Sequence, residues 1–214
     1  MSKAKIALVT GGSRGLGENM AINMAQKGLN ILLTYQSNKE EADKTVREVE
    51  KLGQKAYALQ LDVAESKTFD AFVDEVKNVL ESHFGSATLD YLVNNAGIGI
   101  NSPITETTEQ DFDTLVNIHF KGAFFLTQKL LPIMADGGGI VNISSGLARF
   151  SFPGYSVYGS MKAAIETLTR YQAKELGSRQ IRSNVVAPGA IETDFGGGTN
   201  KNDEDKRTAI ANFT

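Results

Sequence analysis

The stretch that decides the fold is Thr10-Gly11-Gly12-Ser13-Arg14-Gly15-Leu16-Gly17, which follows a short apolar run and opens a stretch of helical period. Glycines at such a junction let the backbone turn tightly and approach a pyrophosphate, whose charge the N-terminus of the following helix favours. The spacing is T-G-x-x-x-G-x-G, and the more usual G-x-G-x-x-G is not met because Met20 stands at its last position. An isolated loop of this composition is as often a plain turn, so its place in the order of elements decides.

Strand-length apolar runs alternate with longer stretches of helical period along the chain. We expect strands at 6–9, 31–33, 57–61, 89–93, 140–143 and 182–187, and helices at 15–27, 39–52, 67–84, 108–134 and 155–176. The strands are too apolar to face water on one side, which is typical of a parallel sheet. The sequence therefore predicts an α/β fold, a Rossmann-like doubly wound parallel sheet of six strands with helices on both faces, in a single domain over residues 1–214.

Composition and charge exclude several classes of protein. The chain has 214 residues, of which 41% are hydrophobic and 22% charged, as in ordinary globular domains. Without cysteine, and without histidines or carboxylates at ligand spacing, we expect neither disulfides nor a metal site. A net charge of −3 with no basic block speaks against a nucleic-acid partner. Apolar runs far below the ~18 residues of a membrane span, and no signal-peptide core, predict a cytoplasmic protein without a membrane partner.

The helix expected at 108–134 is apolar on more than one face. Its apolar residues are Phe112, Leu115, Val116, Phe120, Phe124, Leu126, Leu130 and Leu131. A helix that is apolar on two faces is buried on two faces, and the sheet explains only one of them. A second subunit is a natural cover for the other, so we expect a homo-oligomer, a dimer or a tetramer. The alternative is an unusually deep helix in a monomer.

A tyrosine and a lysine stand four residues apart on the helix expected at 155–176. Tyr158 and Lys162 therefore lie on one helix face, whereas Tyr155 has Gly159 at the same spacing. A free phenol has a pKa of about 10 and is a poor acid or base near neutrality. A nearby ammonium favours the phenolate and is expected to lower that pKa toward useful acid/base strength.

Five further polar residues need an interpretation. Ser144 and Ser145 both follow the fifth strand, at the edge where α/β sites form, and chemistry alone does not choose between them. Asn117 lies in mid-helix, where asparagine is a poor helix former, which is a local conflict typical of functional sites. A solvent-facing asparagine is the alternative. His83 and His119 have no partner at triad or metal-ligand spacing, and we expect both to be structural.

The chain resembles the short-chain dehydrogenases/reductases in their compact single-domain branch. The resemblance rests on the loop at 10–17 and on four further motifs in register: Asn94-Asn95-Ala96-Gly97; Asn117; Ser145 with Tyr158-x-x-x-Lys162; and Pro188-Gly189-x-Ile191-x-Thr193. It covers essentially the whole chain, which within this family looks most like the 3-oxoacyl-[acyl-carrier-protein] reductases. It implies hydride transfer between a nicotinamide cofactor and a small-molecule carbonyl or secondary alcohol.

The resemblance also implies a role for each motif residue. Tyr158 would be the acid/base, Ser145, chosen by its spacing to the tyrosine, would hold the carbonyl oxygen, and Lys162 would bind the nicotinamide ribose. Asn117 would disturb its helix and anchor a water that relays protons through the lysine. The implied cofactor contacts are Gly11, Ser13, Arg14, Gly15, Leu16, Gly17, Tyr35, Ser37, Asn38, Lys39, Asp62, Val63, Asn94, Ala96, Gly97, Tyr158, Lys162, Pro188, Gly189, Ile191 and Thr193.

The choice of cofactor follows from charge. Enzymes of this architecture that use NAD place an acidic residue about 20 residues beyond the glycines, on the ribose 2′-hydroxyl. Here Tyr35-Gln36-Ser37-Asn38 offers no carboxylate, and Lys39 and Arg14 would attract a 2′-phosphate. NADP(H) is therefore favoured over NAD(H), unless Lys39 is merely solvated and Arg14 is paired elsewhere.

Alternatives remain for the function and for the end of the chain. An NAD-dependent sugar or polyol dehydrogenase is one alternative. A non-catalytic, cofactor-sensing protein is another, although such relatives typically lack the tyrosine or the lysine. Residues 194–214 are expected to form a mobile segment over the substrate. Relatives continue into a further helix and a seventh strand, so either the protein is naturally short or the sequence is a truncated copy. We favour a truncated copy, because six strands would leave a buried apolar edge of the sheet uncovered.

Overall fold

The structure is a computed structural model that describes residues 4–193, 195, 204, 207 and 208. A six-stranded sheet in the order β3-β2-β1-β4-β5-β6 forms its centre, and every neighbouring pair is parallel. The strands are β1 (Ile6–Val9), β2 (Asn30–Tyr35), β3 (Ala56–Gln60), β4 (Leu89–Asn94), β5 (Met134–Ile143) and β6 (Arg182–Val186). The predicted doubly wound parallel sheet is confirmed.

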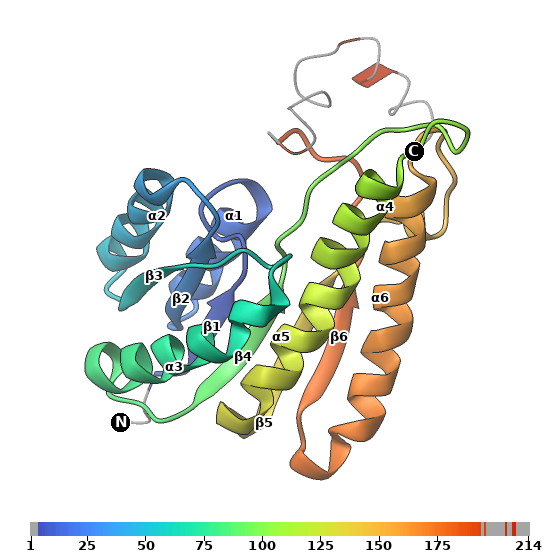
Figure 1. Cartoon of the computed structure of the whole chain (residues 1–214). Helices are drawn as coiled ribbons and strands as arrows, with labels where there is room; N and C mark the ends of the chain where they lie inside the picture. The colour runs from blue at the N-terminus through green and yellow to red at the C-terminus, as the bar shows by residue number, and fades with distance from the viewer. Residues whose placement is uncertain (1–3, 194, 196–203, 205–206, 209–214) are drawn as a thin grey trace.

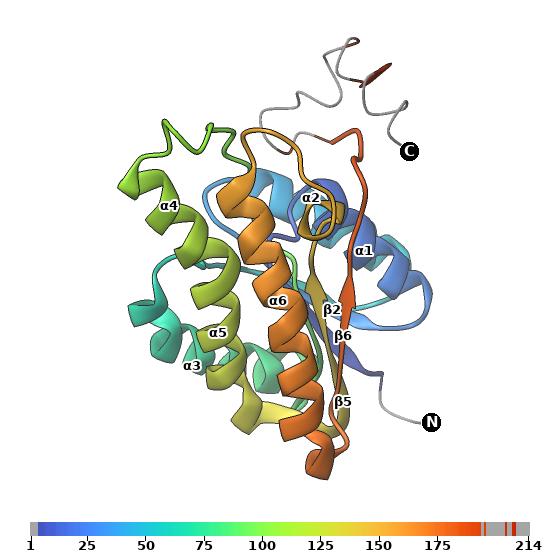
Figure 2. The same ribbon diagram turned by 90° about the vertical axis from the view of Figure 1, so that its right-hand side faces the viewer.

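Helices cover both faces of this sheet (Figures 1 and 2). On one side lie α1 (Gly15–Gln26) and α2 (Lys39–Lys51), and on the other lie α3 (Phe69–Val79), α4 (Glu109–Val116), α5 (Gly122–Leu130) and α6 (Ser156–Glu175). Short 3-10 turns span Ser66–Thr68, Leu131–Ile133, Gly146–Ala148 and Gly177–Arg179. Alternate residues of β1 serve the two layers: Ile6 and Leu8 pack with α3 and α5, and Ala7 packs with α1 and α2. Strands buried on both faces explain their continuous apolar sequences.

The helix predicted at 108–134 is not continuous. It consists of α4, a π-helical segment Asn117–Lys121, α5 and a final 3-10 turn, and a second π-helical segment, Leu80–Phe84, follows α3. The break is explained at Gly122, where an added Cβ would lie 2.2 Å from the Val63 carbonyl oxygen. The helix backbone therefore packs directly on the loop after β3, and the wider turn accommodates that contact.

The fifth strand begins earlier than predicted, at Met134. The predicted helix therefore ends too late, because Met134 already belongs to β5. Met134 already pairs with Leu89, and the register then shifts before Tyr91 pairs with Gly139. The irregularity needs glycine: Gly137 has φ +74°, and a Cβ on Gly138 would lie 2.5 Å from the Asp90 carbonyl oxygen. A glycine-rich run reads as a loop in the sequence, although here it forms a bulged strand.

The topology creates a crevice at one edge of the sheet. The chain proceeds from β1 to β2 in one direction and reaches β4 on the other side of β1, so the strand order reverses at β1. Open α/β sheets bind ligands at such a switch point, outside the carboxyl ends of the strands. The residues just after β1, β4 and β5 therefore meet at one edge.

Candidate active site

Thr10, the residue after β1, joins the two loops at the switch point. It is buried, and its Oγ1 accepts hydrogen bonds from the backbone N–H groups of Asn95 (2.9 Å) and Ala96 (3.0 Å). The same hydroxyl donates to the Val93 carbonyl oxygen at 3.2 Å. One side chain thus holds the turn after β4 against the turn after β1.

The glycine-rich loop is packed backbone against backbone. A Cβ on Gly17 would lie 2.1 Å from the Gly11 carbonyl oxygen, and Gly11 itself has φ +62°. The side-chain amide of Asn95 donates to the carbonyl oxygens of Thr10 (2.9 Å) and Gly11 (3.2 Å). Asn95 belongs to the motif Asn94-Asn95-Ala96-Gly97 but was not predicted as a site residue. Its two hydrogen bonds hold the backbone of the glycine-rich loop against the turn after β4.

The start of α1 fits a phosphate group. The helix begins at Gly15, and Arg14 at its N-cap makes no capping hydrogen bond with its side chain. In contrast, α2 is capped by the Asn38 side chain, which accepts from the Glu41 N–H. The first N–H groups of a helix have no intrahelical partner, and the helix dipole favours an anion there. The residues of α1 and its loop therefore suit a pyrophosphate.

The predicted cofactor contacts at or after the ends of β2 and β3, together with Arg14, differ in exposure. Ser37 is exposed after β2, whereas Tyr35 is buried in the core beneath α2. Lys39 forms an exposed ion pair with Asp43 at 2.7 Å. This agrees with the alternative interpretation, in which Lys39 is a solvated surface residue. Arg14 is exposed and has no ion-pair partner within the part of the chain that the structure describes. Asp62 accepts from the Gln36 side chain and the Ala64 N–H.

The predicted cofactor-binding segment 188–193 reaches both neighbouring loops. The Pro188 carbonyl oxygen accepts from the Gly146 N–H at 2.9 Å. A Cβ on Gly15 would lie 3.7 Å from Thr193, so the segment containing Gly189 and Ile191 spans from the end of β5 to the start of α1. The predicted substrate segment that follows, 194–214, falls mostly outside the described residues.

Tyr158 and Ser145 meet where α6 passes the end of β5. The Ser145 hydroxyl accepts from the Leu147 N–H at 3.2 Å and lies close enough to the Tyr158 side chain to act on the pKa of its phenol, which it lowers. Ser144, the sequence alternative, points elsewhere: its hydroxyl donates to the Lys162 carbonyl oxygen at 3.1 Å and lies 3.1 Å from a Glu166 carboxylate oxygen. Geometry thus places Ser145 beside the tyrosine and Ser144 against the α6 backbone.

Lys162 is buried beside the same tyrosine. Its Nζ donates to the Ile143 carbonyl oxygen at 2.8 Å and lies 5.5 Å from the centroid of the Tyr158 ring. Burial lowers the pKa of Lys162 to about 8, and burial raises the pKa of Tyr158 to about 12 despite the opposing effect of Ser145. The lowered phenol pKa expected from the sequence is wrong for the chain by itself, because burial disfavours the phenolate and outweighs the effect of Ser145.

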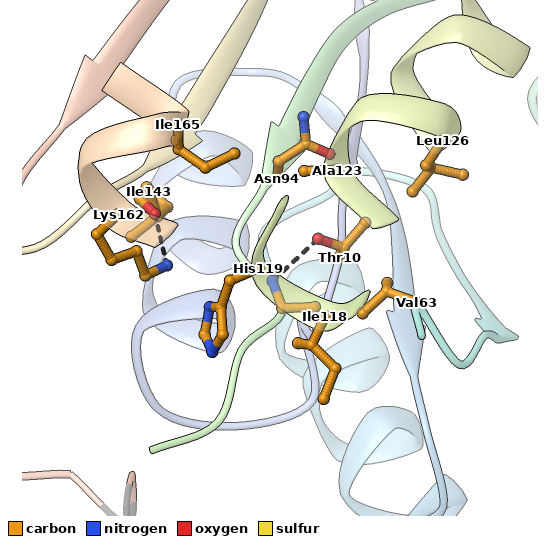
Figure 3. A pocket seen from close by; sticks show the side chains of 11 residues that line it. Thr10, Val63, Asn94, Ile118, His119, Ala123, Leu126, Ile143, Lys162 and Ile165 are labelled. Atoms are coloured by element: carbon orange, nitrogen blue, oxygen red, sulfur yellow. Dashed lines mark hydrogen bonds between the residues drawn. The ribbon is translucent and has the colours of Figure 1, made fainter. Parts of the chain in front are cut away.

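A small cavity lies next to the Lys162 side chain (Figure 3). It has a volume of about 10 Å³ and is lined by Thr10, Val63, Asn94, Ala96, Ile118, His119, Ala123, Leu126, Ile143, Lys162 and Ile165. Asn94 is buried, and its amide donates to the side chains of Thr127 (3.0 Å) and Asn142 (2.8 Å). The cavity therefore connects the end of β1 with the lysine on α6.

His119 lies in this cavity, whereas Asn117 is not among its lining residues. The sequence predicts a structural role for His119 and did not place it at this cavity, although a signal for its burial was present: Leu115, His119, Gly122 and Leu126 share one helix face, and all four are buried. A histidine in such a stripe faces the sheet. His83 lies elsewhere, between the rings of Tyr57 and Phe84.

Comparison with known sequences decides the family. The sequence model of the short chain dehydrogenase family matches residues 5–204. The chain belongs to this family. This short chain dehydrogenase is 39% identical to a 3-oxoacyl-[acyl-carrier-protein] reductase from Staphylococcus aureus. The match extends over 197 residues, which are 91% of this chain and 78% of that protein.

Solved structures of this short chain dehydrogenase's relatives agree. A short chain dehydrogenase from Burkholderia cenocepacia in complex with NADP is 35% identical, with a TM-score of 0.86 over 95% of this chain and 80% of that one. An angucycline C-6 ketoreductase with bound NADP is 33% identical, with a TM-score of 0.91 over 98% of this chain and 80% of that one. The chain is thus an NAD(P)-linked oxidoreductase of the CH-OH and carbonyl type.

Two absences complete the description. In the described part of the chain, no helix has the length and apolar character to cross a membrane. The described residues likewise include no group of three or more metal-ligating side chains close enough to hold an ion.

Proposed function

We propose that this short chain dehydrogenase is an NADP(H)-dependent oxidoreductase that uses Tyr158 as its acid and base. The observation that carries the proposal is the meeting of Tyr158, Ser145 and Lys162 at the end of β5, in a site whose cavity extends to Thr10 beside the glycine-rich loop. A phosphate-binding helix start and an acid/base pair thus share one sheet edge.

The side chains divide the chemistry between them. A nicotinamide cofactor, when bound, supplies the hydride to a carbonyl carbon or takes it from a carbinol carbon. Tyr158 is protonated at neutral pH, because its pKa is about 12, and can donate its proton to the carbonyl oxygen. The Ser145 hydroxyl, already beside Tyr158, can donate a second hydrogen bond to that oxygen as negative charge develops. The Lys162 ammonium stabilises the phenolate that remains.

The preference for NADP(H) is proposed from charge at the open end of the site. No carboxylate stands at 35–38, and Arg14 and Lys39 are both exposed. The ion pair of Lys39 with Asp43 lies at the surface, where such pairs contribute little and exchange readily. Two related structures contain NADP, which agrees with this choice. We expect tighter binding of NADPH than of NADH, and a loss of that difference in a variant with Arg14→Ala and Lys39→Ala.

We propose a 3-oxoacyl compound as the substrate class. The similarity to the S. aureus reductase supports it. A second small cavity next to Tyr158 has a mixed lining, with Ile100, Leu115 and Val157 beside the polar Ser102, Thr107 and Asp111, so it has apolar surface for part of a carbon chain.

Homo-oligomer formation is also proposed. On the face of α4 and α5 away from the core, Phe112, Phe124 and Phe125 are exposed by 47%, 39% and 39%. Large exposed aromatic groups of this kind mark an interface more often than open surface. Light scattering during gel filtration should give a dimer or tetramer, and a monomer at micromolar concentration would contradict this. The cytoplasmic location expected from the sequence stays a prediction.

The test of the activity uses ethyl acetoacetate, a soluble 3-oxo ester, with NADPH deuterated at the transferable position of the nicotinamide. Hydride transfer predicts loss of the NADPH absorbance and one deuterium at the carbinol carbon of ethyl 3-hydroxybutanoate. Xylose serves as the sugar probe. Consumption of NADPH with xylose alone would overturn the substrate class, and binding of NADPH without turnover of any carbonyl probe would overturn the enzymatic proposal.

A further inference from the structure

His119 enters the site from the π-helical segment between α4 and α5. Its side chain is buried, with 3% of the residue exposed, and its ring stands edge-on to the Tyr158 ring, with the centroids 5.0 Å apart and an interplanar angle of 85°. Figure 3 shows the His119 and Lys162 side chains ending side by side at the cavity, although they come from different helices. The imidazole thus touches the acid/base residue and adjoins its ammonium partner.

One nitrogen of His119 has a clear structural task. Nε2 lies 2.8 Å from the Ile98 carbonyl oxygen and 3.3 Å from the Ile98 N–H. The shorter contact assigns the proton to Nε2, which donates to that carbonyl. Gly97 makes room for the ring, since a Cβ there would lie 2.7 Å from the His119 Cε1. The ring is therefore fixed against the loop that follows β4.

The other nitrogen is left as a buried acceptor. Nδ1 of His119 has no hydrogen-bond partner among the described residues, and neither has Oδ1 of Asn94, which lines the same cavity. Burial, with the nearby charge of Lys162, lowers the pKa of His119 to about 3, so the ring is neutral and Nδ1 keeps its lone pair at physiological pH. Unpaired buried acceptors are unfavourable and uncommon in native structures.

Lys162 supplies the complementary donors. An ammonium has three N–H groups, and one of them is used by the Ile143 carbonyl oxygen. The cavity therefore joins a lysine with donors to spare and two side chains that lack a donor. Its volume of about 10 Å³ is close to the space of one water molecule, which needs two to four polar partners. Asn117, to which the resemblance assigned water binding, does not line this cavity.

We propose that His119 is a positioning residue of the active site, whose Nδ1 forms, with the Asn94 amide oxygen and the Lys162 ammonium, a pocket for one water that holds the ammonium beside Tyr158. This inference rests on the proposed function, since its consequence is the charge state of Lys162 during proton transfer. Among the described residues, the titratable groups that line the cavity are His119 and Lys162, while Tyr155 packs against the Tyr158 ring and Asp111 lines the second cavity next to Tyr158. A neutral acceptor next to the ammonium keeps the lysine charged.

The first arm of the test needs no substrate. The chain has two histidines, so a long-range proton–nitrogen NMR spectrum contains two ring systems, and His83→Phe identifies that of His119. We expect a neutral ring with its proton on Nε2 from pH 8 to pH 5, and a displaced Nδ1 resonance in Lys162→Met. A ring titrating near its ordinary pKa, a proton on Nδ1, or an Nδ1 resonance unaffected by Lys162→Met would overturn the proposal.

The second arm compares His119→Phe, which keeps an aromatic ring without nitrogens, with His119→Gln, which restores an amide acceptor. With NADPH and ethyl acetoacetate, His119→Phe should lower kcat about tenfold to a hundredfold and leave the KM for NADPH within about twofold, as expected for misplaced catalytic groups. The alkaline limb of its pH profile should move to lower pH, because the ammonium loses its acceptor, and His119→Gln should recover part of both effects.

Controls separate this inference from the function on which it rests. His83→Phe, away from the site, should retain the kcat and pH profile of the unaltered chain. Equal losses in His119→Phe and His119→Gln, or an unchanged pH profile in His119→Phe, would overturn the positioning role. If the unaltered chain reduces no carbonyl probe, the proposed function fails, and the NMR result alone decides whether His119 and Lys162 are coupled. Should His119→Phe not fold, His119→Gln and Lys162→Met still provide both readouts.

Discussion

Replacing Thr10 by valine tests the joint between the loops after β1 and β4. The change keeps the shape of the side chain and removes the hydroxyl that accepts from the N–H groups of Asn95 and Ala96. The Val93 carbonyl oxygen keeps a partner, because the Thr10 N–H also donates to it at 3.0 Å. Two partly buried N–H groups then lack an acceptor, at about 1–3 kcal/mol each. We expect the free energy of unfolding to fall by about 2–6 kcal/mol.

Urea unfolding followed by circular dichroism measures this loss, and NADPH fluorescence measures the effect on cofactor binding. Thr10→Ser is the matched control: it keeps the hydroxyl and loses one methyl group, worth about 0.8 kcal/mol. The valine variant should therefore be clearly less stable than the serine variant and bind NADPH more weakly. Equal stability of the two variants would refute the role assigned to the hydroxyl.

Two other consequences concern Gly17 and His119. Gly17→Ala should lose about 1–3 kcal/mol of stability and most NADPH affinity, because the added Cβ would lie 2.1 Å from the Gly11 carbonyl oxygen, whereas Gly177→Ala, with nothing within 4 Å, should be neutral in urea unfolding. The pKa of His119 is about 3 in the folded chain against an ordinary 6.5, so its contribution to stability is complete above pH 6.5 and is lost as pH falls toward 3. At pH 5 this loss is about 2 kcal/mol. Urea unfolding of His119→Gln should show a correspondingly weaker pH dependence, and an unchanged one would contradict the buried neutral ring.

Most of the fold could be predicted from local sequence pattern. The strand Ile6–Val9 and the helix starts at Gly15 and Lys39 lie where the apolar period and the glycines indicated. What could not be predicted depends on contacts between distant segments. The π-helical segment before Gly122 depends on the Val63 carbonyl oxygen, and the early start of β5 depends on pairing with Leu89. Neither partner is visible within a local window of sequence.

The candidate site also has features that the sequence could predict and features that it could not. Tyr158 and Lys162 could be paired by helical spacing, and Ser145 by resemblance, since nothing local separates it from Ser144. Their pKa values could not be predicted, because desolvation depends on how the fold buries them and it reversed the direction expected for the phenol. The place of His119 in the site could not be predicted from sequence spacing, because its neighbours Ile98 and Tyr158 come from other elements.

The most direct test of the central claim compares two neighbouring tyrosines. Tyr158→Phe and Tyr155→Phe each remove one hydroxyl, and the two rings lie 6.3 Å apart on the same stretch of chain. With NADPH and ethyl acetoacetate, Tyr158→Phe should lower kcat by about a hundredfold or more while NADPH still binds, and Tyr155→Phe should stay close to the unaltered chain. Unchanged turnover in Tyr158→Phe, or an equal loss in both variants, would contradict the assignment of Tyr158 as the acid and base.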